Sequence, residues 1–117
     1  MIKVYCYSLC STCKKALAWL DAHGYKYDLI DIKTQHPDEK TLRSLHKKSG
    51  LPLKKFFNTS GLLYKSMELK NKLPEMSEEE QLRLLATDGM LVKRPILING
   101  TKVVVGFKES DYEEAVK

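Results

Sequence analysis

Two cysteines separated by two residues are the part of this 117-residue sequence that is best placed to do chemistry. They stand in the run Cys10-Ser11-Thr12-Cys13. A thiol is a nucleophile only as the thiolate, and the free amides and positive dipole at the start of a helix stabilise that anion. Two intervening residues on a helical turn bring the sulfurs close enough to bond. An attack by Cys10 on a disulfide or an oxidised substrate can therefore be resolved by Cys13.

Two plainer interpretations compete with this chemistry. The cysteines could be small buried hydrophobic residues, or half of a zinc site completed by Cys6 and a histidine. The sequence has no second Cys-x-x-Cys and no His-x-x-x-His pair, so we predict no metal site. Cys6 itself is either an ordinary buried residue or a spare thiol.

Composition and charge limit the setting in which these thiols work. Three cysteines are too few for a disulfide framework, and closely spaced thiols in a reducing compartment are more often catalytic, redox-sensing or metal-binding. The chain has no apolar run of about 18 residues and no signal-peptide core at its amino terminus. The net charge of +5 is spread without a run of five basic residues. We expect a cytoplasmic monomer that neither crosses a membrane nor binds nucleic acid directly.

The elements that position the cysteines can be read from local patterns. Residues 2–7 alternate in character and carry β-branched and aromatic side chains, which predicts a strand. From residue 11 to residue 23 apolar side chains recur at helical spacing, with Cys13 on the inward face. Residues 25–32 predict a second strand, and strands joined by such a helix run parallel. Cys10 is thus predicted to lie at the start of the first helix.

The rest of the chain is predicted to hold helices and then a hairpin. One helix is predicted over residues 38–48, and another over 78–87 with Ser77 and Glu80 as a capping box. After Arg94-Pro95, two strands over residues 96–98 and 102–105 join through Asn99-Gly100, a strong hairpin signal. A capping box of Ser110 and Glu113 predicts a short final helix.

Together the strand-cysteine-helix start, the helical middle and the Arg-Pro-hairpin ending resemble the glutaredoxin-related arsenate reductase (ArsC) family, which includes the Spx-type transcription regulators. The resemblance covers essentially the whole chain, and residues 10–16, residues 57–61 with Tyr64, and residues 88–95 are its most specific parts. It implies an α/β thioredoxin-like fold with a four-stranded mixed sheet. We expect one domain over residues 1–117, with a helical insertion at about 35–90 between the βαβ and ββα halves.

Roles for individual residues follow from this resemblance. In the family, the cysteine matching Cys10 attacks arsenate, and the arginine matching Arg94 precedes a cis proline and holds the oxyanion and the thiolate. A guanidinium is a permanent cation that can fork onto an oxyanion or lower the pKa of a thiol. We therefore assign Cys10 as nucleophile, Cys13 as resolving thiol and Arg94 as electrostatic partner. The predicted substrate site consists of Ser11, Thr12, Ser60 and Pro95.

Departures from the family pattern point away from arsenate as the substrate. Arsenate reductases of this type carry two further arginines, one where this chain has Ser60 and one near Lys108. They have a histidine in place of Cys6 and lack a cysteine in place of Cys13. We predict a thiol-disulfide oxidoreductase-like protein that reduces arsenate poorly, binds no cofactor, and takes electrons from glutathione, glutaredoxin or thioredoxin.

A regulatory function is the alternative. Spx-type regulators have a Cys-x-x-Cys at this position that switches on oxidation, and they act by binding RNA polymerase. They place an arginine where this chain has Ser60. The glycine with which they contact the polymerase lies near Gly50, which is equally explained here as a helix stop.

Two geometric expectations complete the analysis. The Arg94-Pro95 peptide bond should be cis and lie beside the Cys10 sulfur. The pKa of Cys10 should lie below the ordinary thiol value of about 8.5, and that of Cys13 should not, because only Cys10 stands at the helix start facing cations.

Overall fold

The first half of the sheet is built as the sequence predicts. The structure, a computed structural model, describes all residues from 1 to 117. Its first elements are β1 (Ile2–Cys6), α1 (Ser11–Ala22) and β2 (Tyr27–Asp31). β1 and β2 run parallel, with Cys6 opposite Asp31. The predicted strand–helix–strand unit is confirmed, and Cys10 stands directly before the first residue of α1.

The second half of the sheet is the predicted hairpin. Its elements are β3 (Ile96–Asn99), β4 (Lys102–Val105) and the final helix α6 (Glu109–Val116). β3 lies antiparallel to both β1 and β4, which gives the strand order β2-β1-β3-β4. The sheet is therefore four-stranded and mixed, and the expected α/β thioredoxin-like fold class is confirmed.

The start of α6 differs from the prediction. The sequence predicts a capping box of Ser110 and Glu113, but α6 begins at Glu109 and its N-cap residue is Lys108. The carbonyl of Lys108 accepts the amide of Tyr112 at 3.0 Å, and no side chain caps the helix. Ser110 already lies inside the first turn, so its hydroxyl does not occupy the capping position.

Between β2 and β3 the chain is helical throughout, in short pieces. The elements are α2 (Glu39–Ser49), η1 (Leu53–Phe56), α3 (Leu62–Ser66), α4 (Leu69–Lys72), η2 (Leu73–Glu75), α5 (Glu78–Leu85) and η3 (Gly89–Leu91). α2 and α5 match the two predicted helices to within two residues, and the Ser77–Glu80 capping box is formed. The shorter elements were not predicted. None of the helices has both the length and the apolar character that a membrane span requires.

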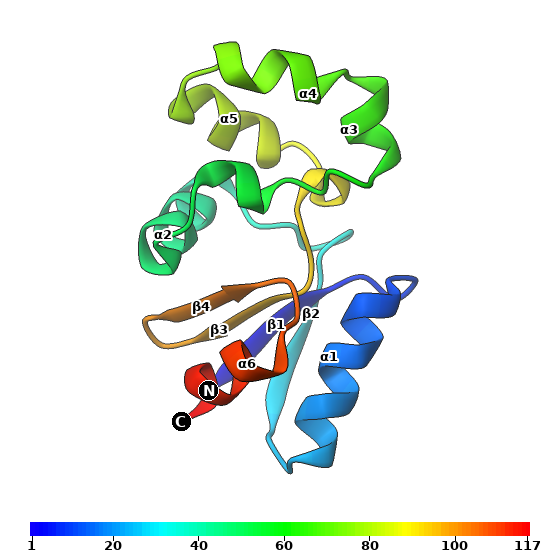
Figure 1. Ribbon diagram of the computed structural model, residues 1–117, viewed down its shortest axis with the longest axis vertical. Coiled ribbons are helices and arrows are strands. Elements are labelled where there is room, and N and C mark those ends of the chain that lie inside the picture. Colours follow the sequence, from blue (N-terminus) through cyan, green and yellow to red (C-terminus); the bar gives the residue numbers. More distant parts are fainter.

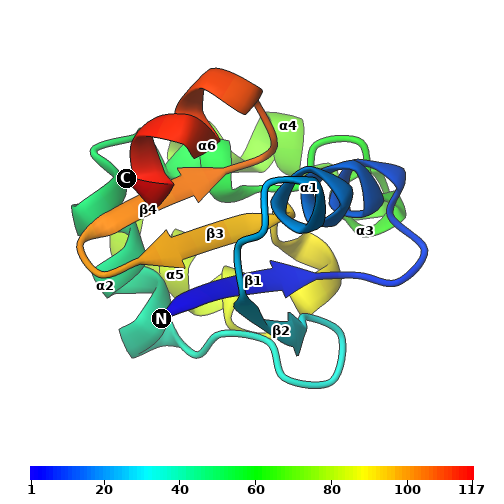
Figure 2. The ribbon, with the colours of Figure 1, turned by 90° about the horizontal axis from the view of Figure 1, so that it is seen from below.

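The sheet separates two hydrophobic cores. α1 and α6 cover one face, and the helices of the insertion pack on the other (Figures 1 and 2). The thiol-side core consists of Ile2, Val4, Cys6, Cys13, Ala16, Trp19, Leu20, Leu97, Tyr112 and Ala115. The insertion-side core consists of Ile32, Leu42, Leu45, Leu53, Phe56, Phe57, Tyr64, Leu69, Leu73, Leu82, Leu85, Leu91, Val92 and Ile96. Because successive side chains of a strand point to opposite faces, Cys6 joins the first core while Tyr5 and Tyr7 pack against the second.

Candidate functional site

Cys10 caps the amino terminus of α1. A tight turn, in which the Cys10 amide donates to the Tyr7 carbonyl at 3.0 Å, carries the chain from β1 into the helix. The Cys10 side chain is half-buried, and its sulfur accepts the amide of Cys13 at 3.4 Å. The first turn of α1 contains no acidic residue. A thiolate at Cys10 would therefore receive a backbone hydrogen bond and the positive end of the helix dipole, with no carboxylate in that turn to oppose it.

Cys13 lies one turn further along, inside the thiol-side core. Its side chain is only 1% exposed, and its sulfur accepts the amide of Tyr7 at 3.5 Å. A hydrogen bond with the Cys6 thiol, helped by the Tyr7 amide, by Cys10 and by the charge of Arg94, lowers the pKa of Cys13 to about 6 although burial opposes this. The same contact, together with burial, raises the pKa of Cys6.

The expected division between the two thiols is therefore wrong for Cys13. The sequence predicts an ordinary pKa for this residue because it stands inside the helix and away from the helix end. In the fold, however, the end of β1 lies against it and supplies two donors, the Cys6 thiol and the Tyr7 amide. These donors come from outside the helix, so the helix position alone could not indicate them.

Arg94 reaches the site from the opposite side of the sheet. It follows η3 and precedes Pro95, and the Arg94-Pro95 bond is cis as predicted. Its guanidinium lies 5.1 Å from the centre of the Tyr7 ring and donates to the carbonyls of Met90 and Val92, both at 3.3 Å. These partners are neutral, so the positive charge stays available to the thiols.

The predicted substrate residues lie at different depths. Ser11 and Thr12 are exposed on the first turn of α1, whereas Pro95 is buried. Ser60 is exposed in the loop before α3. That loop begins at Phe57, which bridges to Val92, and the Asn58 amide donates to the Leu91 carbonyl at 2.8 Å. The structure thus brings the Ser60 loop beside the segment that carries Arg94.

A small cavity opens beside the inner thiols. It has a volume of about 200 Å³ and is lined by Cys6, Tyr7, Ser8, Cys13, Lys14, Leu17, Leu29 and Asp31. Cys10 does not line it. Sequence reasoning left the role of Cys6 open and did not single out Tyr7; the alternating pattern of β1 was the signal that placed Cys6 on the inward face.

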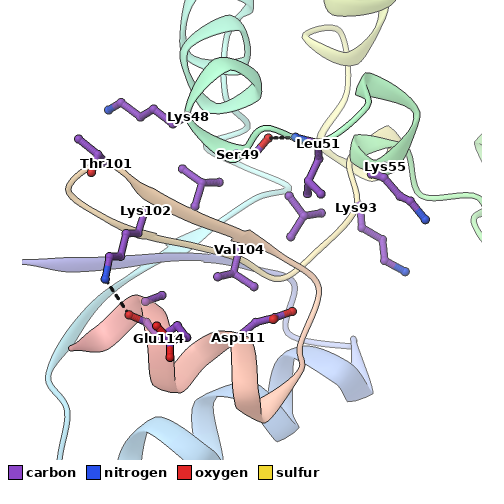
Figure 3. A pocket seen from close by; sticks show the side chains of 13 residues that line it. Lys48, Ser49, Leu51, Lys55, Lys93, Thr101, Lys102, Val104, Asp111 and Glu114 are labelled. Carbon is purple, nitrogen blue, oxygen red and sulfur yellow. Dashed lines mark hydrogen bonds between the residues drawn. The ribbon is translucent and has the colours of Figure 1, made fainter.

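A larger groove lies elsewhere on the molecule. It has a volume of about 660 Å³ and follows β4, the outer strand of the sheet, between the end of α2 and α6 (Figure 3). Lysines and valines make up most of its lining, and Lys102 bonds to the Glu114 carbonyl across one end at 2.8 Å. It contains no cysteine and no predicted site residue, so the candidate site is the smaller region around the thiols.

Comparison with known proteins agrees with this arrangement. The profile of the ArsC family matches residues 5–115. The chain belongs to the ArsC family. The crystal structure of an ArsC family related protein from Bacteroides fragilis superposes with a TM-score of 0.96 at 46% identity, covering 97% of this chain and 96% of that one.

Relatives of the chain within this family have names of different kinds. The uncharacterized protein YusI of Bacillus subtilis is 56% identical over 94% of this chain and 93% of its own length. An arsenate reductase of Haemophilus influenzae is 31% identical over 83% of each chain. The regulatory protein MgsR of Bacillus subtilis is 26% identical over 92% of this chain and 83% of its own length. Membership of the family therefore leaves both an enzymatic and a regulatory function open.

Proposed function

We propose that this ArsC-family protein is a thiol-disulfide oxidoreductase that cycles Cys10 and Cys13 between dithiol and disulfide. One observation supports this most directly: the Cys10 sulfur caps α1 and accepts the Cys13 amide, while the Cys13 sulfur lies buried behind it. The outer thiol is reachable by a substrate, and the inner one is shielded from everything except the outer thiol and the small cavity.

The reaction follows from this order of depth. The Cys10 thiolate attacks one sulfur of a substrate disulfide, forms a mixed disulfide and releases the other sulfur as a thiolate. Cys13, whose pKa is lowered to about 6 by its Cys6 and Tyr7 donors, is then largely deprotonated at neutral pH. It attacks the Cys10 sulfur, forms the Cys10–Cys13 disulfide and releases the second substrate thiolate. Two electrons from glutathione, glutaredoxin or thioredoxin restore the dithiol.

Arsenate is a poor substrate in this proposal because too few cations face it. Binding a phosphate-like anion beside a thiolate brings two anions together, and fixed cations must offset their repulsion. Arg94 provides one such charge. Ser60 contributes only an exposed hydroxyl, and Lys108 is exposed and lacks the forked geometry of arginine. If each missing arginine removes about 2 kcal/mol, two of them lower transition-state binding roughly a thousandfold.

An NADPH-coupled assay tests the proposal. Wild type, Cys10→Ser, Cys13→Ser and the surface control Ser44→Ala are given a small disulfide with glutathione and glutathione reductase, and then arsenate with glutaredoxin added. We expect disulfide turnover in wild type and Ser44→Ala, and loss of at least 100-fold in Cys10→Ser. Equal turnover in Cys10→Ser would contradict the assignment of Cys10. Arsenate turnover as fast as disulfide turnover would contradict the substrate preference, and Ser60→Arg should raise it.

A regulator that binds RNA polymerase is the second candidate. What favours it is the alignment with MgsR, and with proteins named Spx that are 22–24% identical over 95% of this chain. A pull-down with Cys13→Ser in reducing and oxidising buffer separates the two functions. Oxidation-dependent capture of RNA polymerase subunits would support regulation, and capture of glutaredoxin or thioredoxin as mixed disulfides with Cys10 would support the enzyme.

A further inference from the structure

Cys6 is a buried thiol that the two-cysteine cycle does not use. It is the last residue of β1, is 5% exposed and belongs to the same core as Cys13. The Tyr7 amide, which follows Cys6 directly in the chain, donates to the Cys13 sulfur at 3.5 Å. Cys6 and Cys13 also line the same small cavity. The sulfur of Cys13 therefore lies against the residue that carries the Cys6 thiol, at the short range that a disulfide between neighbouring elements needs.

Cys13 is the middle member of the three thiols. Toward the helix start, its amide donates to the Cys10 sulfur at 3.4 Å. Toward the end of β1, it shares the cavity with Cys6, and Cys10 is not among the residues that line that cavity. Cys10 and Cys6 thus approach Cys13 from different sides. Exchange between disulfides requires this placement, because the attacking and leaving sulfurs must lie on either side of the sulfur that is attacked.

We propose that Cys6 is a third redox thiol, which attacks Cys13 in the Cys10–Cys13 disulfide and transfers the bond to a Cys6–Cys13 disulfide. The proposal rests on the two-cysteine cycle described above. In this step the Cys13–Cys10 bond breaks, the Cys13–Cys6 bond forms, and Cys10 leaves as a thiolate. The proton lost by Cys6 is taken up by the Cys10 thiolate or by solvent. No electrons enter or leave, so the step needs no further oxidant.

The order of the steps follows from the contacts of Cys6. In the reduced protein the hydrogen bond to Cys13 is the largest cause that raises the pKa of Cys6, so Cys6 stays a thiol while Cys13 is the thiolate. Once Cys13 is bonded to Cys10, its negative charge is gone and this cause is removed. Cys6 therefore becomes a better nucleophile only after the first disulfide has formed. The transfer returns a reduced Cys10 to the helix start, where it can attack a second substrate.

Peptide mapping after oxidation tests the proposal. Cys10→Ser is the informative variant because serine also caps a helix well and should leave the fold intact. The protein is oxidised with diamide, blocked with iodoacetamide, digested and mapped by mass spectrometry. Trypsin leaves all three cysteines in one peptide, residues 4–14, whereas chymotrypsin separates them by cleaving after Tyr7 and Leu9. We expect Cys10→Ser to yield a Cys6–Cys13 cross-link in most molecules, and Cys13→Ser to yield no Cys6–Cys10 cross-link.

The wild type gives a second, independent readout. Each oxidised molecule keeps one free thiol, and we expect at least a tenth of the iodoacetamide label on Cys10 rather than on Cys6. Label on Cys6 alone, with no cross-link in Cys10→Ser, would overturn the transfer step while leaving the two-cysteine cycle intact. A Cys6–Cys13 cross-link in Cys10→Ser without any Cys10–Cys13 disulfide in the wild type would instead refute the two-cysteine cycle.

Discussion

The two faces of the sheet contribute different things to the candidate site. The thiol-side core contains both buried cysteines and is built from β1, α1 and α6, whereas the insertion-side core is larger and contains no cysteine. Arg94 nevertheless comes from the end of the insertion. The two regions meet at Tyr7, whose amide donates to the Cys13 sulfur and whose ring lies against the Arg94 guanidinium. The redox chemistry is thus local to one turn, while the cation that supports it depends on a separately packed region.

The largest expected effect tests how much the insertion-side core contributes to stability. Phe56 is fully buried there, so Phe56→Ala should lower the free energy of unfolding by about 3–5 kcal/mol through lost burial and the cavity left behind. Leu62→Ala, at a site 86% exposed, is the control and should change it by less than about 0.5 kcal/mol. Urea denaturation measures both values. Equal small effects would mean that the insertion contributes little to the fold.

The junction between the two regions should be the next most sensitive place. Gly89 packs against the backbone beyond β2, and a β-carbon built on it would lie 1.9 Å from the Ile32 carbonyl oxygen. Backbone cannot rotate away as a side chain can, so Gly89→Ala should cost about 2–3 kcal/mol. Gly50→Ala is the matched control, because its added methyl group meets nothing within 4 Å and only its positive φ of 68° opposes alanine. Urea midpoints that fall equally in both variants would contradict the close approach at Gly89.

A pH series isolates the thiol-side core. The pKa of Cys13 is lowered to about 6, so its contribution to stability is fully present above the pKa of the unfolded thiol and is lost as the pH falls through about 6. Cys6, whose pKa is raised, stays protonated in both states over this range. The free energy of unfolding, measured under reducing conditions, should rise between pH 6 and about 8.5 by up to about 1.4 kcal/mol per pH unit.

Cys13→Ala should remove most of this slope while lowering stability at every pH. The lost methylene and sulfur contacts do not titrate, so their cost is constant across the series. A slope that is the same in wild type and Cys13→Ala would show that another group causes it.

The difference between the two faces also explains what the sequence could predict. The β1–α1–β2 unit, the hairpin and Cys10 as a helix cap follow from strand alternation, helical spacing and Asn99-Gly100, which are all local signals. α3 and α4 are only five and four residues long, too short to form alone. They exist because side chains such as Leu69 are buried against distant parts of the insertion. A contact that spans such distances in sequence leaves no local pattern.

The site shows the same limit. Cys10, Cys13 and the cis bond before Pro95 were found from motifs, but the acidity of Cys13 was predicted wrongly. It depends on Cys6 and on the Tyr7 amide, which belong to another element and approach Cys13 only when β1 packs against α1.

The smallest expected effect compares two serines that look alike in sequence, one in each region. Ser77 and Ser110 both precede a glutamate by three residues. Ser77 accepts the Glu80 amide at 3.1 Å and its own amide donates to the Glu80 carboxylate at 3.0 Å, so Ser77→Ala should lower the free energy of unfolding by about 1 kcal/mol. Ser110 lies within the first turn of α6 and caps nothing, so Ser110→Ala should change it by less than about 0.5 kcal/mol. Urea denaturation of the two single variants resolves this difference because they share one wild-type reference. An equal loss in Ser110→Ala would mean that α6 starts at Ser110 after all, as the sequence pattern predicts, and that the lysine before it is not the cap.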